Sequence, residues 1–340
     1  MVCDRPVGVE TPRSSPDRVP SDVVTEHIQD VLTRIQARVL GEVVPLAPLE
    51  MGVSAALRCV VSDSVFAAAD ALEQSSSAAL SGDTAVLPAV RPLVPAGTVV
   101  GPMHMQALLD AGVQQVSVHP QPRVVVVAVS EGSASARIAA IAAAVELTDA
   151  VSLPVQAESE VDLQDVLDDQ LVRADVLVVC GGWDESGPAA ALSAARSLGD
   201  VDIAFTGLTA LPVIGCGRVG ADPVPVLLLP ADPASQLVGF HVFLWPLIAA
   251  LQGRTSVALP TLHAVLTDEE IDARGLEPAE LHVAFASSRP VTEGARAVKC
   301  MHVRTPFALA DIDMLVLTPV GSQAQPGAQV MAVPLTQPGW

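Results

Sequence analysis

The chain has 340 residues, half of them hydrophobic, and its 38 acidic residues outnumber its 18 basic ones, which gives a formal net charge of −20. Nucleic acid and anionic membrane surfaces are therefore excluded as expected partners, because both bind basic surfaces. Tyrosine is absent and aromatic residues make up 3% of the chain, so we expect a core of valine, alanine and leucine in α/β layers rather than an aromatic-rich β-sandwich.

The spacing of the cysteines and the length of the apolar segments predict a cytoplasmic location. The five cysteines are scattered, with no C-x-x-C pair and no histidine at metal-binding spacing, which is typical of a reducing compartment. The N-terminal residues lack the apolar segment of a signal peptide, so we expect a cytoplasmic protein. The most apolar window, residues 237–251, contains His241 and Pro246 and is shorter than the roughly 20 residues of a bilayer span. We expect it to be a buried helix, without membrane insertion.

The first 120 residues are expected to form a tail and then an N-terminal dimerisation and linker region. Residues 1–20 contain four prolines and mixed charges, which predicts a disordered tail. From Ser21 to residue 39, apolar side chains recur at helical spacing, which predicts an amphipathic helix. An apolar strand or short helix at 51–61, a helix at 101–111 and a strand at 115–118 follow. We assign no role to residues 62–90, which include a helical pattern at 66–72.

Residues 121–254 are expected to form an α/β domain, because strand and helix patterns alternate along them. The strand patterns lie at residues 123–129, 151–156 and 176–179 and near Ile203, Val213 and Val226. Helix patterns end at residue 146, cover 158–169 and 189–198, and run from 234 to 251. This alternation predicts a doubly wound, mostly parallel sheet with right-handed crossovers.

The last part of the chain, residues 255–340, has a different pattern. Short strand patterns separated by turn residues lie at 281–286, 297–303, 314–318 and 330–333. Such spacing predicts a small antiparallel β domain.

The expected ligand site lies at the strand ends of the α/β domain, where open sheets of this type form their crevice. The candidate ligand-binding residues follow three buried strands: Ser130, Glu131, Gly181, Gly182, Asp184, Asp232 and Ser235. Glu131 and Asp184 are the candidate metal ligands, because carboxylates suit divalent cations. A structural turn is the alternative for the paired glycines, and a helix cap is the alternative for Asp232. No residue is assigned a catalytic role, and Cys180 is expected to be a packed thiol.

Three stretches of this sequence resemble the MoeA family, the molybdopterin molybdenumtransferases related to the E domain of gephyrin. They are AGT at 96–98 with LLDAG at 108–112, LPADPAS at 229–235, and MLVLTP at 314–319 with Pro326-Gly327. The resemblance covers about residues 21–335. It implies an elongated homodimer whose pterin site lies between the α/β domain and a partner's β domain. It also implies insertion of molybdate into adenylated molybdopterin, with Mg²⁺ as the divalent ion and release of AMP.

Four family motifs are altered in this chain. The S-A-M-D-G-Y-A motif becomes SAALRC at 54–59, with Leu57 in place of the acid, and the T-G-D motif becomes Val129-Ser130-Glu131. The S-G-G-V motif keeps its glycines but continues with Trp183. If the crevice is closed, Trp183 should pack against residues 231–233; if the crevice still binds an anionic ligand, Trp183 should be partly exposed at its rim. The K-P-G-K-P motif becomes LTALP at 208–212, so both cationic positions are lost. The chain between residues 61 and 93 is also too short for the inserted β subdomain of the family.

These changes leave two hypotheses. The first is a shortened, catalytically degenerate paralogue that keeps the fold and the dimer in order to bind another protein or peptide. The second is an active molybdenumtransferase. The loss of preorganised charge contacts at several positions favours the first, and the resemblance itself favours the second. Fold alone does not decide between them.

Overall fold

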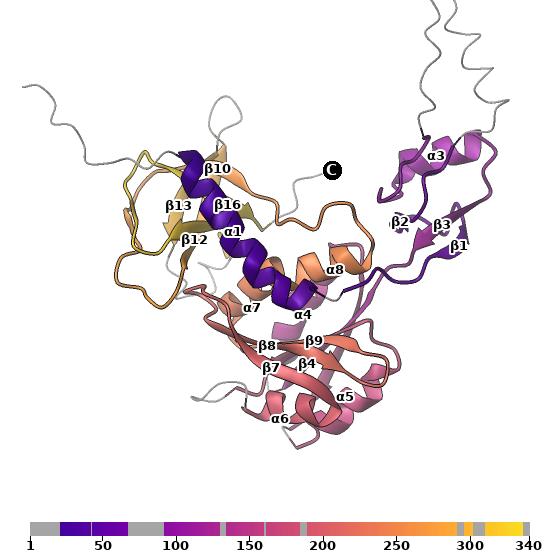
Figure 1. Ribbon diagram of the computed structural model, residues 1–340, viewed down its shortest axis with the longest axis horizontal. Helices are drawn as coiled ribbons and strands as arrows, with labels where there is room; N and C mark the ends of the chain where they lie inside the picture. Colours follow the sequence, from indigo (N-terminus) through magenta and orange to yellow (C-terminus); the bar gives the residue numbers. More distant parts are fainter. Residues whose placement is uncertain are drawn as a thin grey trace, which may run out of the picture.

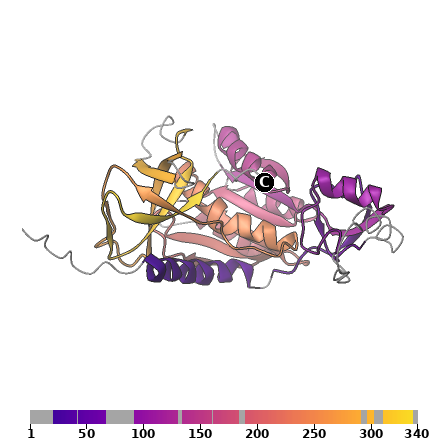
Figure 2. The ribbon, with the colours of Figure 1, turned by 90° about the horizontal axis from the view of Figure 1, so that it is seen from above.

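The computed structural model describes residues 21–41, 43–66, 92–129, 134–159, 161–183, 189–290, 296–301 and 310–335. A β-barrel lies at one end of the elongated molecule, an α/β sheet with its helices lies in the middle, and a small β subdomain lies at the other end (Figures 1 and 2). The expected tail at 1–20 and the helical pattern beyond Phe66 lie outside the described residues.

Helix α1 (Ser21–Leu40) runs from the barrel to the α/β domain (Figures 1 and 2). Four apolar positions of the predicted helix are buried, namely Ile28, Val31, Leu32 and Ile35, and Val24 and Val39 are half-buried. The polar face adds contacts to the barrel side of the molecule, because Thr25 Oγ1 lies 3.1 Å from His263 Nε2 and Arg34 forms an ion pair with Glu280. The amphipathic helix predicted from the sequence is confirmed, and it joins two parts of the fold.

The central sheet has six strands in the order β5-β4-β6-β9-β8-β7. The strands are β4 (Arg123–Val129), β5 (Val151–Ala157), β6 (Val176–Gly181), β7 (Gly199–Phe205), β8 (Val213–Val219) and β9 (Val224–Leu229). Strand β4 pairs in parallel with β5 and β6, and β6 pairs in parallel with β9. Only β8 is reversed relative to its neighbours. The doubly wound, mostly parallel sheet is therefore confirmed.

Helices cover both faces of this sheet. Along β4 the side chains alternate, so that Val125 and Val127 pack with α5 (Leu163–Leu171) and α6 (Ala189–Leu198). Val124 and Val126 belong to the opposite cluster, which includes α1, α4 (Ala134–Glu146) and the helix after β9. A strand buried on both faces reads as a continuous apolar run. This explains the unbroken valines of the sequence.

The helix after β9 is continuous but not regular. It consists of α7 (Pro233–Gly239), a π-helical turn η1 (Phe240–Leu244) and α8 (Trp245–Leu251). Pro246 has no N–H to donate to the carbonyl of Val242, four residues earlier. Gln36 Nε2 of α1 donates to that carbonyl at 2.8 Å, and Gln36 is buried. The side chain of α1 thus replaces a backbone hydrogen bond that proline removes.

Replacing Gln36 with leucine is expected to lower the free energy of unfolding by about 2 kcal/mol, because the buried carbonyl of Val242 then loses its donor. Urea denaturation of the variant measures this loss. The matched control is Gln29→Leu, at an exposed position of the same helix, and it should change stability little. Equal midpoints for the two variants would show that the Gln36 hydrogen bond contributes nothing.

The same π turn carries His241, whose pKa burial lowers to about 4. The folded pKa lies below the unfolded value of about 6.5, so the unfolded state takes up the proton first as the pH falls. Stability should be unaffected above pH 6.5 and should decrease below it, by about 1 kcal/mol per pH unit. Denaturation at pH 7.5 and at 5.5 measures the slope, and His241→Gln should flatten it. An equal slope in parent and variant would contradict this assignment.

The long helix also bears on the membrane question. By length and composition, residues Pro233–Leu251 would suffice to cross a bilayer, and 72% of their most apolar window is buried inside the protein. That burial is the property of a core helix. It agrees with the buried helix expected from the sequence.

The C-terminal domain is a closed barrel in the order β10-β13-β12-β14-β16. Its strands are β10 (Leu262–Leu266), β12 (Leu281–Pro290), β13 (Arg296–Met301), β14 (Met314–Pro319) and β16 (Gln329–Pro334). The β domain is confirmed, with two corrections. Strand β10 was not among the predicted strands, and it pairs with β13 in parallel rather than antiparallel. Two short strands, β11 (Ile271–Asp272) and β15 (Gln323–Ala324), pair beside it.

The small N-terminal subdomain contains β1 (Leu49–Gly52), β2 (Val60–Val61), β3 (Gln115–His119) and α3 (Pro102–Asp110), with β3 between the other two strands. One polar network joins it to the α/β domain. Arg58 Nε donates to Asp149 Oδ1 at 2.6 Å, and Arg254 Nη2 donates to Asp149 Oδ2 at 3.0 Å. Arg58 has φ 68°, a left-handed conformation that suits the glycine of the family motif at this position.

Candidate functional site

The strand order places a topological switch between β4 and β6. From β4 the chain goes to β5 on one side, and it then returns to β6 on the other side of β4. Val129 at the end of β4 pairs with Gly181 at the end of β6. Ligands of open α/β sheets bind outside the carboxyl ends of strands at such a switch. Of the seven candidate residues, Ser130, Glu131 and Asp184 lie outside the described residues, and the other four follow β6 and β9.

The glycine turn after β6 has a structural reason. Gly181 has φ 102°, and a Cβ there would lie 2.6 Å from the carbonyl oxygen of Val129. Gly182 has φ 67°, and its Cβ would lie 3.1 Å from the backbone nitrogen of Ala191. The N–H of Ala191, in the first turn of α6, donates to the carbonyl of Gly182 at 3.3 Å. One of the helix N–H groups that an anion would use therefore already has a partner in the chain.

Trp183 follows these glycines and is half-buried. Its indole Nε1 is buried and has no hydrogen-bond acceptor among the described residues. A buried donor without a partner carries an energetic cost. The expected packing of Trp183 against residues 231–233 stays a prediction.

Asp232 and Ser235 organise the start of α7. Asp232 is the N-cap residue, and its Oδ1 accepts a hydrogen bond from the backbone N–H of Ser235 at 2.9 Å. Ser235 Oγ donates to the carbonyl of Ala210 at 3.1 Å. The helix-cap alternative for Asp232 is thus confirmed, and both side chains hold neighbouring backbone in place.

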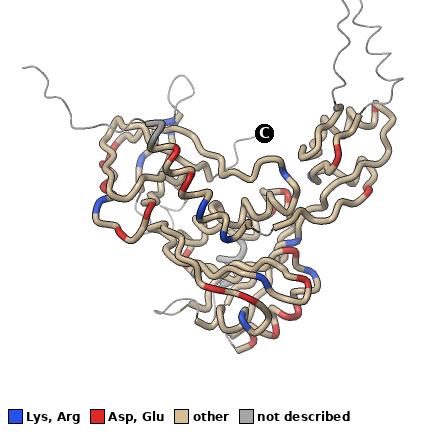
Figure 3. Tube along the Cα trace, in the orientation of Figure 1, with Lys and Arg blue, Asp and Glu red and all other residues tan. Residues whose placement is uncertain are grey.

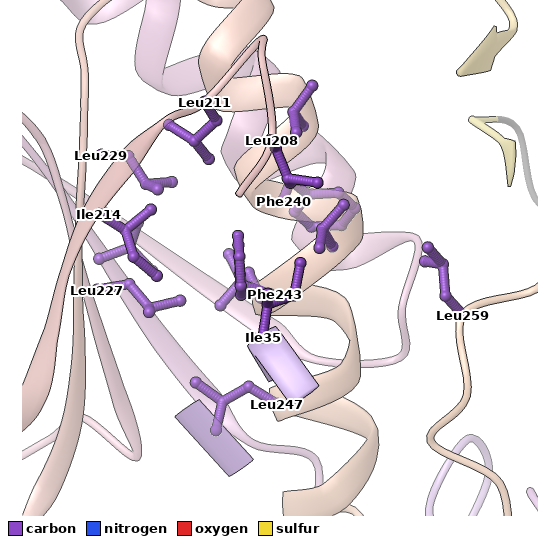
Figure 4. Close-up of a cluster of buried hydrophobic side chains, with 14 of the residues drawn as sticks. Ile35, Leu208, Leu211, Ile214, Leu227, Leu229, Phe240, Phe243, Leu247 and Leu259 are labelled. Atoms are coloured by element: carbon purple, nitrogen blue, oxygen red, sulfur yellow. The ribbon is translucent and has the colours of Figure 1, made fainter. Parts of the chain in front are cut away.

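The loop between β7 and β8 carries the altered K-P-G-K-P motif and lies against this helix. Leu208 and Leu211 are both 0% exposed and belong to the core cluster that joins the sheet, the long helix and the barrel. Figure 4 shows them among Leu229 and Phe240. The two positions that are cationic in the family pattern are apolar core positions here.

The same loop is fixed to strand β12 of the barrel. The backbone N–H of Thr209 donates to the carbonyl of Leu281 at 3.1 Å, and the N–H of Val283 donates to Thr209 Oγ1 at 3.0 Å. Thr209 Oγ1 also lies 3.1 Å from His282 Nδ1, and burial lowers the pKa of His282. The sequence analysis did not predict this contact, because no local sequence pattern indicates a contact between two residues that are 73 positions apart.

Comparisons with known proteins fit this architecture. The chain matches no protein-family model. It is 31% identical over 175 residues to Molybdopterin molybdenumtransferase 1 of Mycobacterium tuberculosis, in strains CDC 1551 and H37Rv. The aligned part makes up 47% of this chain and 41% of the relative, so it spans less than half of the curated protein.

Solved structures give the fold over most of the chain. A molybdopterin biosynthesis MoeA protein from Pyrococcus horikoshii has a TM-score of 0.69 at 14% identity, and the match covers 91% of this chain and 99% of that one. A molybdenum cofactor biosynthesis protein from Pyrococcus furiosus has a TM-score of 0.64 at 16% identity, with 89% and 98% covered. This chain has the fold of these MoeA proteins.

No group of three or more histidine, cysteine, aspartate or glutamate side chains is placed to hold a metal ion among the described residues. Leucines occupy the two cationic positions, and burial raises the pKa of Cys180, at the end of β6, to about 12. The thiol is a packed group rather than a nucleophile, because the thiolate is the reactive form.

Proposed function

We propose that this chain is a catalytically degenerate member of the MoeA family of molybdenum cofactor biosynthesis, which acts as a binding or scaffold protein. The observation that carries the proposal is the complete burial of Leu208 and Leu211 in the core between the sheet and the barrel. These side chains support the fold at the place where the family pattern has cations.

The pyrophosphate of the adenylated pterin needs cationic or hydrogen-bonding partners when it leaves water. A desolvated anion without cationic side chains or free N–H groups costs several kcal/mol. Leucine offers neither, and the N–H of Ala191 is already bonded to the carbonyl of Gly182. Asp232 and Ser235 are likewise engaged with backbone groups. The described residues therefore contribute little favourable free energy to the binding of such a substrate.

The assembly we propose is a homodimer in the cytoplasm that binds a protein or peptide partner. The resemblance to the MoeA family, which implies an elongated homodimer, supports this assembly. Light scattering at micromolar concentration measures the assembly. A mass of two chains is expected, and a mass of one chain would contradict the dimer.

Release of AMP tests the proposed loss of activity. The chain is incubated with adenylated molybdopterin, molybdate and Mg²⁺, with the M. tuberculosis relative as the positive control. We expect no AMP above the background of buffer alone. AMP release coupled to molybdate insertion would instead establish the alternative, an active molybdenumtransferase, which the 31% identity favours.

A further inference from the structure

A cavity of about 480 Å³ lies away from the glycine turn, at the opposite edge of the sheet. Its walls are the C-terminal end of α1 and the adjoining parts of β7, β8 and the start of β9, including Asp200, Cys216, Arg218 and Pro225. Pairing of Arg218 with both Asp200 and Pro225 brings the three strands together here. The volume is that of a small-molecule pocket.

Among the described residues that line this cavity, the charged side chains are those of Arg38, Asp200 and Arg218. Arg38 lines it from the last turn of α1 and forms no ion pair or hydrogen bond with any residue that the structure describes. The carboxylate of Asp200 likewise has no partner within the described ranges. Arg218 Nη1 donates to the carbonyl of Pro223 at 3.1 Å, which holds its guanidinium at the wall.

Two arginines that line one cavity are unusual in so acidic a protein. The chain carries a net charge of −20, and acidic residues are spread over its surface (Figure 3). Burial raises the pKa of the Cys216 thiol, and the nearby charge of Arg38 lowers it in part. Arg38 and Arg218 both line this space, and guanidinium groups bind a carboxylate or a phosphate with paired N–H donors.

We propose that this cavity binds a small organic anion that also carries an amino or hydroxyl group. Arg38 and Arg218 take its carboxylate or phosphate, and Asp200 accepts a hydrogen bond from its donor group. Cys216 lines the same space, so a bound ligand covers its thiol. This site is separate from the crevice at the strand ends, and it stands whether or not the proposed loss of transferase activity is correct.

Protection of the Cys216 thiol tests the site. In a Cys3→Ser, Cys300→Ser background the other thiols, Cys59 and Cys180, are buried, so a thiol reagent reports on Cys216. The probes are phosphoserine, which has an amino group, and inorganic phosphate, which has none. We expect phosphoserine to slow the modification in a saturable way, and inorganic phosphate to do so at higher concentration only. Calorimetry with the same probes gives an independent affinity.

Two arginine variants on α1 distinguish specific binding in the cavity from nonspecific attraction of an anion to positive charge. Arg38→Gln should weaken phosphoserine binding by about tenfold or more, because it removes a charge-assisted hydrogen bond. Arg34→Gln, one turn earlier and outside the cavity, should leave it unchanged. Absence of protection and of heat with both probes would overturn the proposal, as would equal affinities for the two variants. Loss of the dimer in Arg38→Gln without any protection in the parent would also overturn it, and would assign the surface to contact between copies.

Discussion

Replacing Leu211 with lysine, the residue type of the family motif, is expected to lower the free energy of unfolding by about 4 kcal/mol, because it buries a charge without a partner. Leu211 is 0% exposed. It lies against the long helix, since a Cβ built on Gly239 would be 3.4 Å from Leu211 Cδ2. Chemical denaturation of the variant measures the loss.

The matched control is Leu211→Met, which conserves volume and should cost less than about 1.5 kcal/mol. The comparison separates the effect of charge from that of shape. A lysine variant as stable as the methionine variant would mean that the loop can open and present residue 211 to solvent or to an anion. That result would restore the ligand-binding interpretation of the crevice.

Removing the carboxylate of Asp149 is expected to have the second largest effect, about 3 kcal/mol for Asp149→Ala, because it breaks two ion pairs at once. The side chain of Arg254 is only 10% exposed, whereas that of Arg58 is 51% exposed. Burial lowers the pKa of Arg254, and the charge of Asp149 acts in the opposite direction. Most of the loss should therefore come from the Arg254 pair. Urea denaturation of parent and variant measures it.

The Asp149→Asn variant separates charge from backbone conformation. Asp149 has φ 60°, a left-handed conformation that asparagine tolerates better than alanine. We expect asparagine to cost about 2 kcal/mol, less than alanine, because it keeps the backbone preference and loses only the charge. Asparagine and alanine variants of equal stability would contradict a contribution from the backbone. A parent-like asparagine variant would contradict the ion pairs.

The periodic parts of the fold could be predicted from the sequence, because burial imposes its period on the residues. The predicted bounds of β4 and α6 are those observed, and the buried positions of α1 follow its helical spacing. Strand β10 (Leu262–Leu266) was missed because the exposed Val265 and the small buried Ala264 obscure the alternation of apolar and polar residues. Its parallel pairing with β13 depends on closure of the barrel, which no local signal contains.

The position of the candidate residues at the strand ends could be predicted from the sequence, but their hydrogen-bond partners could not. The strand ends after β6 and β9 do carry the predicted glycines, Asp232 and Ser235. What the residues do there depends on distant partners, such as Ala191 for Gly182 and Ala210 for Ser235. The loss of cations at Leu208 and Leu211 was evident in the sequence. Their burial against the barrel required the tertiary structure, because Leu281 is 73 residues beyond Leu208 along the chain.

We propose that apolar packing has replaced the anion-binding function of this MoeA-like crevice. Calorimetric titration of the folded chain with adenylated molybdopterin in the presence of Mg²⁺ tests it most directly. We expect no saturable heat at micromolar concentrations, because Leu208 and Leu211 are buried where the family pattern has cations. Saturable binding with micromolar affinity would contradict it and would make the active molybdenumtransferase the better description.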